Sequence, residues 1–574
     1  MSIVNKLGQP AKRIVVVGAV AGGASAAARA RRLDEHATIT LFEKGPDPSF
    51  ANCGLPYYIG GEITDRAKLS VQTPASLHAR LNLDVRVLTE VISIDSQAKT
   101  VTTRHLPTGT EETHPYDDLI LSPGSKPFIP PIPGIKRPGA FALRNLEDMD
   151  VIHSWLSGKD AKTAVVAGGG FIGIEMAEQL HRRGLKVTLV EALPQLLAPL
   201  DPEMAMMIQE EMESHGIRVV TGKPIKAFED NASALCGDVV LGDGVPNIPA
   251  DMVLLGLGVR ADTALAKSAG IELNARGGIV VDSQLRTSVP NIWAVGDAIE
   301  VKNPIVGGQW MVALAGPANR QGRMVADNIF GKNREFKGTF GTSVVRVFNL
   351  TAAGTGLNER GLQMANLKYQ AVHLFPNSHA GYYPGASQIA LKLLFEVGGE
   401  NEGRVLGAQA VGNDGADKRI DVIATAMQAG LKVDDLAQLE LCYAPPVGSA
   451  KDPVNYAGMI AQDILDGLVQ TVQYTQIPSL AKDPKYQLLD VRSPKEIETK
   501  GGLPAGTMNI PVDELRSRIN ELPKDKIIVT SCFVGQRGYY AARILMQNGF
   551  EVRNLDGAFS TYLKSGLKKS VDAA

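Results

Sequence analysis

The stretch Ile14-Val15-Val16-Val17-Gly18-Ala19-Val20-Ala21-Gly22-Gly23 decides how the first part of the chain folds. Its β-branched run predicts a strand buried on both faces of a parallel sheet, and the alanine-rich residues 24–33 predict a helix. A second strand is expected at residues 38–42, ending at Glu43. In such a unit the glycines let the backbone approach a pyrophosphate, and Glu43 accepts hydrogen bonds from a ribose. Val20 replaces one glycine of the GxGxxG pattern, so a purely structural turn is the alternative. The candidate site comprises Gly18, Gly22, Gly23, Glu43 and Lys44.

The same arrangement recurs later in the chain. Residues 164–167 predict a strand, Gly168-Gly169-Gly170-Phe171-Ile172-Gly173 is a complete GxGxxG, and a helix and strand follow up to Glu191. A carboxylate at that position bonds a ribose diol but repels a 2′-phosphate, so we expect NADH to be preferred to NADPH. NADPH stays possible because three cations lie nearby, namely Arg182, Arg183 and Lys186. The second candidate site comprises Gly168, Gly170, Gly173 and Glu191.

Three further apolar strands end in small-residue turns, at residues 119–125, 253–258 and 291–298. Turns of this kind are expected where the chain crosses between two dinucleotide-binding domains. The third strand runs into Gly296-Asp297, and an aspartate there can contact the ribityl and phosphate groups of a flavin; a simple turn aspartate is the alternative. We add to the flavin site Ser122, Gly124, Gly296 and Asp297.

Composition describes an ordinary globular chain of 574 residues, long enough for about four domains. A hydrophobic content of 44%, a charged content of 21% and a net charge of −2 give no sign of a nucleic-acid or membrane partner. The four cysteines are widely spread, which excludes a disulfide framework and a CxxC metal pair and favours a reducing cytoplasm. The sequence predicts no signal peptide, no membrane span and no metal cluster.

Cys53 is the first of two cysteines to which we assign chemistry. It lies in Ser49-Phe50-Ala51-Asn52-Cys53-Gly54-Leu55-Pro56, at a Gly-Pro turn that is expected to open a helix. A helix N-terminus supplies free N–H groups and partial positive charge, so we expect a thiolate and interpret Cys53 as redox-active. A small buried cysteine in a loop is the alternative.

Cys532 is the second cysteine to which we assign chemistry. A strand at residues 526–531 runs into Cys532-Phe533-Val534-Gly535-Gln536-Arg537-Gly538, and a helix is expected at residues 539–547. A cysteine that opens a loop before a helix N-terminus, with Arg537 five residues on, is placed to be a thiolate held by backbone N–H groups.

These motifs together carry a resemblance. Residues 12–466 resemble the pyridine nucleotide–disulfide oxidoreductase family, and the single cysteine, with no partner at Tyr58, is similar to its coenzyme A-disulfide reductase branch. NADH oxidases share the single cysteine but usually carry an upstream histidine, for which His36 lies too early. The Cys532 region resembles a single-domain rhodanese, although residues 501–504 lack the histidine often found before its Asn-Ile-Pro turn. The resemblance implies FAD, NADH, coenzyme A as substrate, and a homodimer.

The resemblance also implies roles for three tyrosines. His379-Ala380-Gly381-Tyr382-Tyr383-Pro384-Gly385 and Cys442-Tyr443-Ala444-Pro445-Pro446 are similar to stretches of coenzyme A-disulfide reductases. Tyr382 or Tyr383, with Tyr443, would donate a proton or hydrogen bond at the sulfur site across the dimer; without the family, packing is the commoner role. We expect Cys442 to be structural.

The expected fold class is α/β, with two Rossmann-like dinucleotide-binding domains, an α+β dimerisation domain and a C-terminal rhodanese-like α/β domain. The expected boundaries are 12–150 and 257–335 for the two parts of an FAD-binding domain, 151–256 for an NAD(H)-binding domain, 338–466 for the dimerisation domain, 467–478 for a linker and 479–574 for the rhodanese domain.

The functional hypothesis joins these parts into one electron path, from NADH to the flavin and then to sulfur at Cys53. We expect a reductase of coenzyme A persulfide, polysulfides and, as a lesser activity, coenzyme A disulfide, with Cys532 relaying sulfane sulfur and Arg537 assisting. The alternatives are an NADH oxidase and a sulfur carrier or sensor with slow reductase activity. The phosphates of coenzyme A need cationic side chains to bind them. For each such side chain, a solvated surface charge without a ligand is the alternative. The candidate coenzyme A residues are Arg29, Arg32, Ser49, Asn52, Arg66 and Lys68.

Overall fold

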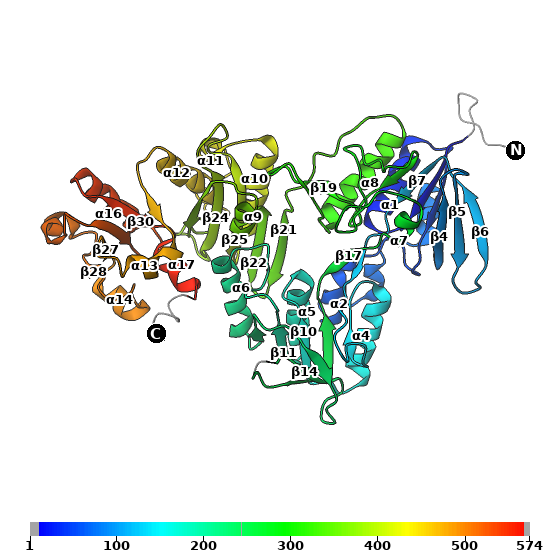
Figure 1. Ribbon diagram of the computed structural model, residues 1–574, viewed down its shortest axis with the longest axis horizontal. Coiled ribbons are helices and arrows are strands. Elements are labelled where there is room, and N and C mark those ends of the chain that lie inside the picture. Colours follow the sequence, from blue (N-terminus) through cyan, green and yellow to red (C-terminus); the bar gives the residue numbers. More distant parts are fainter. Residues whose placement is uncertain (1–10, 243, 567–574) are drawn as a thin grey trace. The chain divides into compact units, whose positions relative to one another are not determined.

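The structure, a computed structural model, describes residues 11–242 and 244–566 (Figure 1). Two compact units divide the chain: Met1–Ala192 with Lys223–Gly341, and Leu193–Gly222 with Thr342–Ala574. Residues 1–10, where the sequence predicts no signal peptide, and residues 567–574 of the predicted rhodanese domain lie outside the described part. No helix of the described part is both long and apolar enough to cross a membrane.

The first unit contains a parallel sheet that matches the first predicted strand-helix-strand unit. Its strands in spatial order are β18 (Ile292–Ala294), β7 (Asp118–Leu121), β1 (Arg13–Val17), β2 (Thr38–Phe42) and β3 (Asp84–Arg86). Helices α1 (Ala21–Leu33) and α8 (Ala315–Ile329) pack together closely. The missing side chain of Gly322 allows this approach, since a Cβ there would lie 2.2 Å from the carbonyl oxygen of Gly22. A separate antiparallel sheet is formed by β4 (Thr89–Asp95), β5 (Thr100–His105) and β6 (Glu111–Pro115), and its strand β4 contacts β2 of the parallel sheet.

The same unit holds a second parallel sheet. Its adjoining strands are β11 (Lys186–Val190), β10 (Thr163–Ala167), β16 (Met252–Leu255) and β9 (Ala140–Phe141). Helix α5 (Phe171–Arg182) begins within the complete glycine motif and packs on β10 and β11. Helix α4 (Leu146–Gly158) begins with a capping box between Asn145 and Asp148.

The second unit begins its fold with an antiparallel sheet. The strands in order are β21 (Ser343–Val347), β22 (Leu350–Gly356), β25 (Val405–Gly412), β24 (Ile389–Glu396) and β23 (Tyr369–Leu374). The helices around it are α6 (Pro202–Ser214), α9 (Glu359–Met364), α10 (Ala416–Ala429), α11 (Val433–Gln438) and α12 (Pro453–Leu465).

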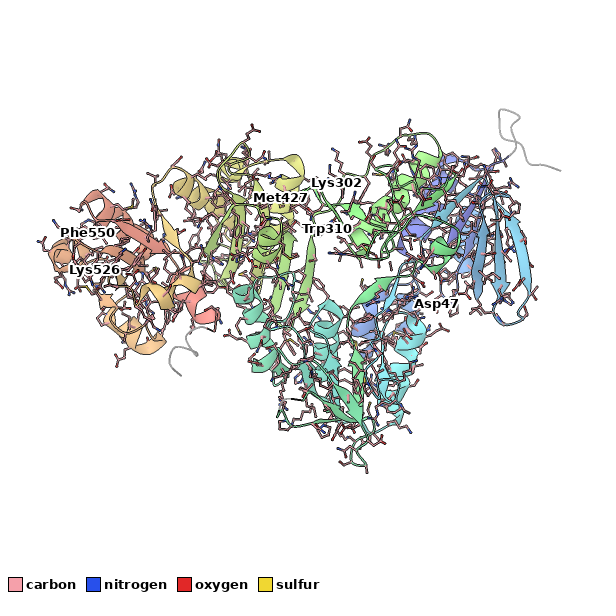
Figure 2. The ribbon with its side chains drawn as sticks, in the orientation of Figure 1. Asp47, Lys302, Trp310, Met427, Lys526 and Phe550 are labelled. Atoms are coloured by element: carbon pink, nitrogen blue, oxygen red, sulfur yellow. The ribbon has the colours of Figure 1, made fainter. Side chains whose placement is uncertain are left out.

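The last part of the second unit is a small parallel α/β domain, orange to red in Figure 1. Its strand order is β26 (Thr471–Val472), β30 (Val552–Leu555), β29 (Ile527–Ser531), β27 (Tyr486–Asp490) and β28 (Met508–Asn509). The helices are α13 (Ile477–Leu480), α14 (Pro494–Lys500), α15 (Leu515–Arg518), α16 (Gln536–Gln547) and α17 (Ala558–Lys564). Phe550, labelled in Figure 2, belongs to its core.

The prediction of a linker at residues 467–478 is wrong. Strand β26 pairs with β30, and Tyr474 is buried in a core cluster of the same domain. The polar Gln and Thr residues of this segment suggested a linker. Edge strands, however, are commonly short and polar, so they lack the alternation of apolar and polar residues that identifies a strand in a sequence. The rhodanese-like domain therefore begins before residue 479.

Candidate active site

The first glycine turn has the geometry that its pattern predicts. Gly18 has φ +91°, and a Cβ there would lie 2.1 Å from the carbonyl oxygen of Ser122. Only glycine fits that conformation and that contact. Glu43 stabilises the turn, since its carboxylate accepts hydrogen bonds from the backbone N–H groups of Ala19 and Gly45, both at 2.9 Å.

The turn after β18 joins this site through a residue that the sequence analysis missed. The backbone N–H of Gly296 donates to Oε1 of Gln321 on α8 at 2.8 Å, and Gln321 is buried. A polar residue on the buried face of an amphipathic helix was the available signal. Burial raises the pKa of Asp297, against a hydrogen bond from Ser125 and the positive charge of Arg144.

The second glycine turn, between β10 and α5, repeats this geometry. Gly168 has φ +108°, and the N–H of Gly169 donates to Oε2 of Glu191 at 2.6 Å. Arg182 donates to Glu178, and Arg183 to the carbonyl oxygen of Ile59. These two arginines are therefore engaged away from Glu191.

Cys53 lies in a short 3₁₀ helix, Asn52–Gly54, followed by the five-residue α2 (Leu55–Ile59). The thiol is exposed, and its Sγ lies 3.6 Å from Oδ1 of Asn52, which also accepts the N–H of Cys53. The surroundings of Cys53 act against the expected thiolate. Removal of water by the surrounding protein raises the pKa of Cys53, and the carboxylates of Glu175 and Asp297 raise it further.

Glu175 on α5 is a second residue that the sequence analysis missed. The hydroxyl of Tyr57, four residues after Cys53, donates to Oε1 of Glu175 at 2.9 Å. This contact joins the cysteine segment to the helix that begins at the second glycine turn. No local sequence pattern predicts this contact, because the two residues are 118 positions apart.

An open cleft of about 530 Å³ lies between α1, α8 and α3 (Pro74–Leu81). Its polar lining includes Arg32, Ser49, Gln72, Arg80, Asn319 and Arg323. Arg32, Arg80 and Arg323 are exposed, and none of the three forms an ion pair with a described residue. The cleft is therefore suited to an anion. Ser49 adjoins the Cys53 segment, and its N–H donates to the carbonyl oxygen of Ala19 at 2.7 Å.

The other predicted coenzyme A cations have different surroundings. Arg29 pairs with the buried Asp327 at 2.7 Å, and Arg66 pairs with Asp150 at 2.7 Å. Either guanidinium would have to give up a carboxylate to bind a phosphate. Lys68 is exposed and does not line the cleft. Lys44 pairs with Glu90 on the surface.

The three predicted tyrosines fall into two groups. The hydroxyls of Tyr382 and Tyr443 lie 3.0 Å apart, and both side chains are exposed. The hydrogen bond between the two hydroxyls raises the pKa of Tyr382. The Tyr383 ring packs edge-on against His379, with centroids 5.7 Å apart. Cys442, which we expected to be structural, is exposed.

Cys532 is buried, and its Sγ accepts a hydrogen bond from the N–H of Gly535 at 3.1 Å, as the loop pattern predicts. Helix α16 begins at Gln536, three residues earlier than predicted, so Arg537 lies in its first turn. Arg537 donates two hydrogen bonds to Glu496, at 2.8 and 2.7 Å, which lower the pKa of Glu496 to about 2. Its guanidinium is thus held by Glu496, and the charge of Cys532 also contributes to the raised pKa of Arg537.

Comparison with known proteins agrees with this architecture. The description "Pyridine nucleotide-disulphide oxidoreductase" matches residues 12–322, its dimerisation domain matches residues 342–453, and a rhodanese-like domain matches residues 474–565. The coenzyme A disulfide reductase of Staphylococcus haemolyticus is 36% identical over 454 residues, which is 79% of this chain and 100% of that protein.

Two solved structures are similar over nearly the whole chain. Reduced CoADR-RHD from Bacillus anthracis has a TM-score of 0.94 and 49% identity, covering 97% of this chain and 99% of its own. The NAD-dependent persulfide reductase from A. fulgidus has a TM-score of 0.88 and 36% identity, covering 96% of this chain and 100% of its own. The expected fold class is confirmed, and the chain belongs to the pyridine nucleotide-disulphide oxidoreductase family, with that family's dimerisation domain and a rhodanese-like domain after it.

Proposed function

We propose that this protein is an FAD-dependent, NADH-oxidising reductase of coenzyme A persulfide and polysulfides that releases hydrosulfide, with coenzyme A disulfide as a lesser substrate. The observation that carries the proposal is the cleft lined by three arginines, adjoining the segment of the lone Cys53. A single exposed thiol beside an anion-binding cleft suits a thiol substrate that carries phosphates. Relatives named as coenzyme A disulfide reductase and persulfide reductase support this choice.

The two glycine turns fit FAD at the first site and NADH at the second. Gly170 is the informative position, because its φ of −82° suits any residue and a Cβ there would meet nothing within 4 Å. Neither backbone strain nor packing requires glycine, so a ligand approaching the backbone explains it. When bound, FAD accepts hydride from NADH and passes two electrons to sulfur.

In the proposed reaction, Sγ of Cys53 attacks the sulfane sulfur of the persulfide. The bond between the two substrate sulfurs breaks, coenzyme A leaves as its thiolate, and a persulfide remains on Cys53. Two electrons originating from NADH then cleave this persulfide, releasing hydrosulfide and regenerating the Cys53 thiolate. Overall, one persulfide, one NADH and one proton yield coenzyme A, hydrogen sulfide and NAD⁺.

The chain's own side chains have distinct tasks in this scheme. Arg32, Arg80 and Arg323 bind the phosphates of coenzyme A, and Asn52 orients the thiol. In a homodimer, which the dimerisation domain supports, Tyr382 and Tyr443 of the partner subunit donate the proton that the departing thiolate takes up. The hydrogen bond between these two hydroxyls makes them a pair rather than independent donors.

Cys532 is assigned a relay of sulfane sulfur to or from Cys53. The N–H of Gly535 already points to its sulfur, which is the contact that a thiolate or persulfide anion needs. Replacement Cys532→Ser is expected to leave reduction of soluble coenzyme A persulfide near the wild-type rate and to abolish use of a sulfane donor such as thiosulfate. Equal loss of both activities would contradict the relay.

The test of the main proposal is anaerobic stopped-flow absorbance. The flavin is reduced with NADH and mixed with coenzyme A persulfide while hydrosulfide is assayed. Rapid flavin reoxidation with one hydrosulfide per flavin is expected, and Cys53→Ser should abolish it. A flavin that stays reduced until oxygen is admitted would instead establish an NADH oxidase. Slow turnover with fast labelling of Cys532 would establish a sulfur carrier.

A further inference from the structure

A buried polar cluster joins the rhodanese-like domain to the dimerisation domain of the same chain. Its members come from three places: the α6 segment, the dimerisation domain, and the segments around β26 and β30 of the rhodanese-like domain. We call these residues the docking cluster: Asp201, Glu203, Glu359, His373, Lys392, Tyr474 and Asp556.

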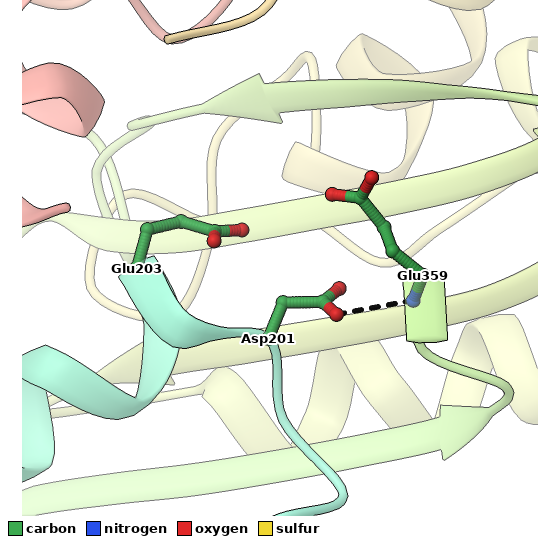
Figure 3. A group of neighbouring side chains, drawn as sticks. All are labelled: Asp201, Glu203 and Glu359. Atoms are coloured by element: carbon green, nitrogen blue, oxygen red, sulfur yellow. Dashed lines mark hydrogen bonds between the residues drawn. The ribbon is translucent and has the colours of Figure 1, made fainter. Parts of the chain in front are cut away.

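Figure 3 shows the three carboxylates of the cluster, those of Asp201, Glu203 and Glu359. Lys392 forms an ion pair with each of them. Its Nζ is 2.8 Å from Asp201, 2.5 Å from Glu203 and 2.5 Å from Glu359, and its side chain is fully buried. Three acidic groups this close resemble a metal site, but the ammonium already supplies the cation. The arrangement is therefore a hydrogen-bonded ion network.

His373 on β23 connects that network to the rhodanese-like domain. Its Nδ1 lies 2.6 Å from Oδ2 of Asp556, and its Nε2 lies 2.9 Å from Oε1 of Glu203. Because both partners are carboxylates, both ring nitrogens must carry a proton for both bonds to form. Burial alone would lower the pKa of His373, but Asp556 and Glu203 outweigh it and raise that pKa to about 9.

The rhodanese-like domain contributes two direct partners. The hydroxyl of Tyr474 donates to Oε2 of Glu203 at 2.7 Å, and Oδ1 of Asp556 accepts the backbone N–H of His373 at 3.0 Å. Backbone packing at this point is equally tight. A Cβ at Gly557, which has φ +63°, would lie 2.7 Å from Cβ of His373.

A short path leads from Asp556 to the sulfur-carrying loop. Asp556 follows β30 and is separated from α17 only by Gly557. In the first turn of α17, the N–H of Phe559 donates to the carbonyl oxygen of Cys532 at 3.1 Å, and the N–H of Ser560 donates to that of Phe533 at 2.9 Å. The loop that carries Cys532 is thus held by a helix that Asp556 anchors.

We propose that His373 and Asp556 are positioning residues for Cys532: their ion pair docks the rhodanese-like domain on its own chain's dimerisation domain and holds the α17 N-terminus against the Cys532 loop. This role goes beyond the proposed reductase activity and does not depend on the identity of the sulfur substrate. It makes opening of the Cys532 loop sensitive to a residue of the dimerisation domain.

The test uses the full-length holoprotein and the variant His373→Leu. The rate of Cys532 alkylation by iodoacetamide is quantified by peptide mass spectrometry, together with hydrogen exchange of the peptide that contains Phe559 and Ser560. Both report opening of the loop, because Cys532 is buried when it is closed. We expect both rates to rise about tenfold, since a charge-assisted hydrogen bond is lost, while flavin reduction by NADH stays unchanged.

Matched variants keep the result interpretable. Arg518→Gln removes two surface ion pairs of the same domain, with Glu514 and Glu521, and should leave both rates at the wild-type value. Asp556→Asn should raise both rates even if His373→Leu does not fold, and Asp556→Glu, which keeps the charge, should lie closer to wild type. Rates within twofold of wild type in the folded His373 and Asp556 variants, or an equal rise in Arg518→Gln, would overturn the proposal. Failure of the reductase proposal would show instead as wild-type protein that releases no hydrosulfide.

Discussion

Replacing Lys392 by methionine should destabilise the second unit in a strongly pH-dependent way. The wild-type ammonium is fully buried and contacts Asp201, Glu203 and Glu359 at 2.8, 2.5 and 2.5 Å. Methionine fills similar space but removes the cation that the three carboxylates share and, among the described residues, leaves only Glu203 with a charged partner, His373. The folded variant can avoid that cost only by holding at least one of them protonated.

The size of the effect follows from the cost of that proton. A carboxyl group with an unfolded pKa of about 4.3 costs about 5 kcal/mol to keep neutral at pH 8 but only about 1 kcal/mol at pH 5. Its folded pKa is raised, so the stabilising effect of protonation is present at low pH and is lost as pH rises. In the wild type, burial alone would raise the pKa of Glu203 but Lys392 and His373 lower it, so the stabilising contribution of this carboxylate is present at neutral pH and is lost in acid.

Differential scanning calorimetry at pH 5 and pH 8 is the appropriate assay. Tryptophan fluorescence would not report the event, since Trp155, Trp293 and Trp310 all belong to the first unit. A loss of 1 kcal/mol lowers the unfolding temperature by about 2–4 °C. We therefore expect the Tm of the second unit to fall by about 10–20 °C at pH 8 and by about 2–4 °C at pH 5. Lys482→Met, at an exposed position, is the control. Equal decreases at both pH values would refute the reasoning.

Three other outcomes test the proposed active site. Arg323→Gln should raise KM for coenzyme A persulfide about tenfold with little change in kcat, because it removes a charge-assisted phosphate contact; an equal change with inorganic polysulfide would contradict a coenzyme A role. In flavin-free protein, alkylation of Cys53 should keep rising above pH 8, because burial and carboxylates raise its pKa, and Glu175→Gln should accelerate it at pH 8; a plateau below pH 7 would contradict this. Glu191→Ala should reduce the preference for NADH over NADPH about tenfold, because the repulsion of a 2′-phosphate is removed. The preference is measured as the ratio of the kcat/KM values of the two nucleotides in steady-state assays.

The sequence alone determined the elements whose cause is local. The β-branched run before Gly18 and the complete motif at Gly168 predicted both glycine turns, because strand burial and left-handed glycine conformations leave a pattern within about ten residues. The Cys532 loop was predictable for the same reason, since a strand, a loop and a helix N-terminus follow one another directly. The polar strand β26 was not, because its pairing partner lies some 80 residues later.

Only the tertiary structure decided which side chains meet. Arg29 and Arg32 lie one turn apart on α1, yet Asp327 engages Arg29, while Arg32 lines the cleft with Arg323. The Cys53 pKa likewise depends on Glu175, and His373 on Asp556, 183 positions away. The physical reason is that a charge responds to whatever carboxylate or solvent lies within a few ångströms, and those neighbours are set by the packing of distant segments.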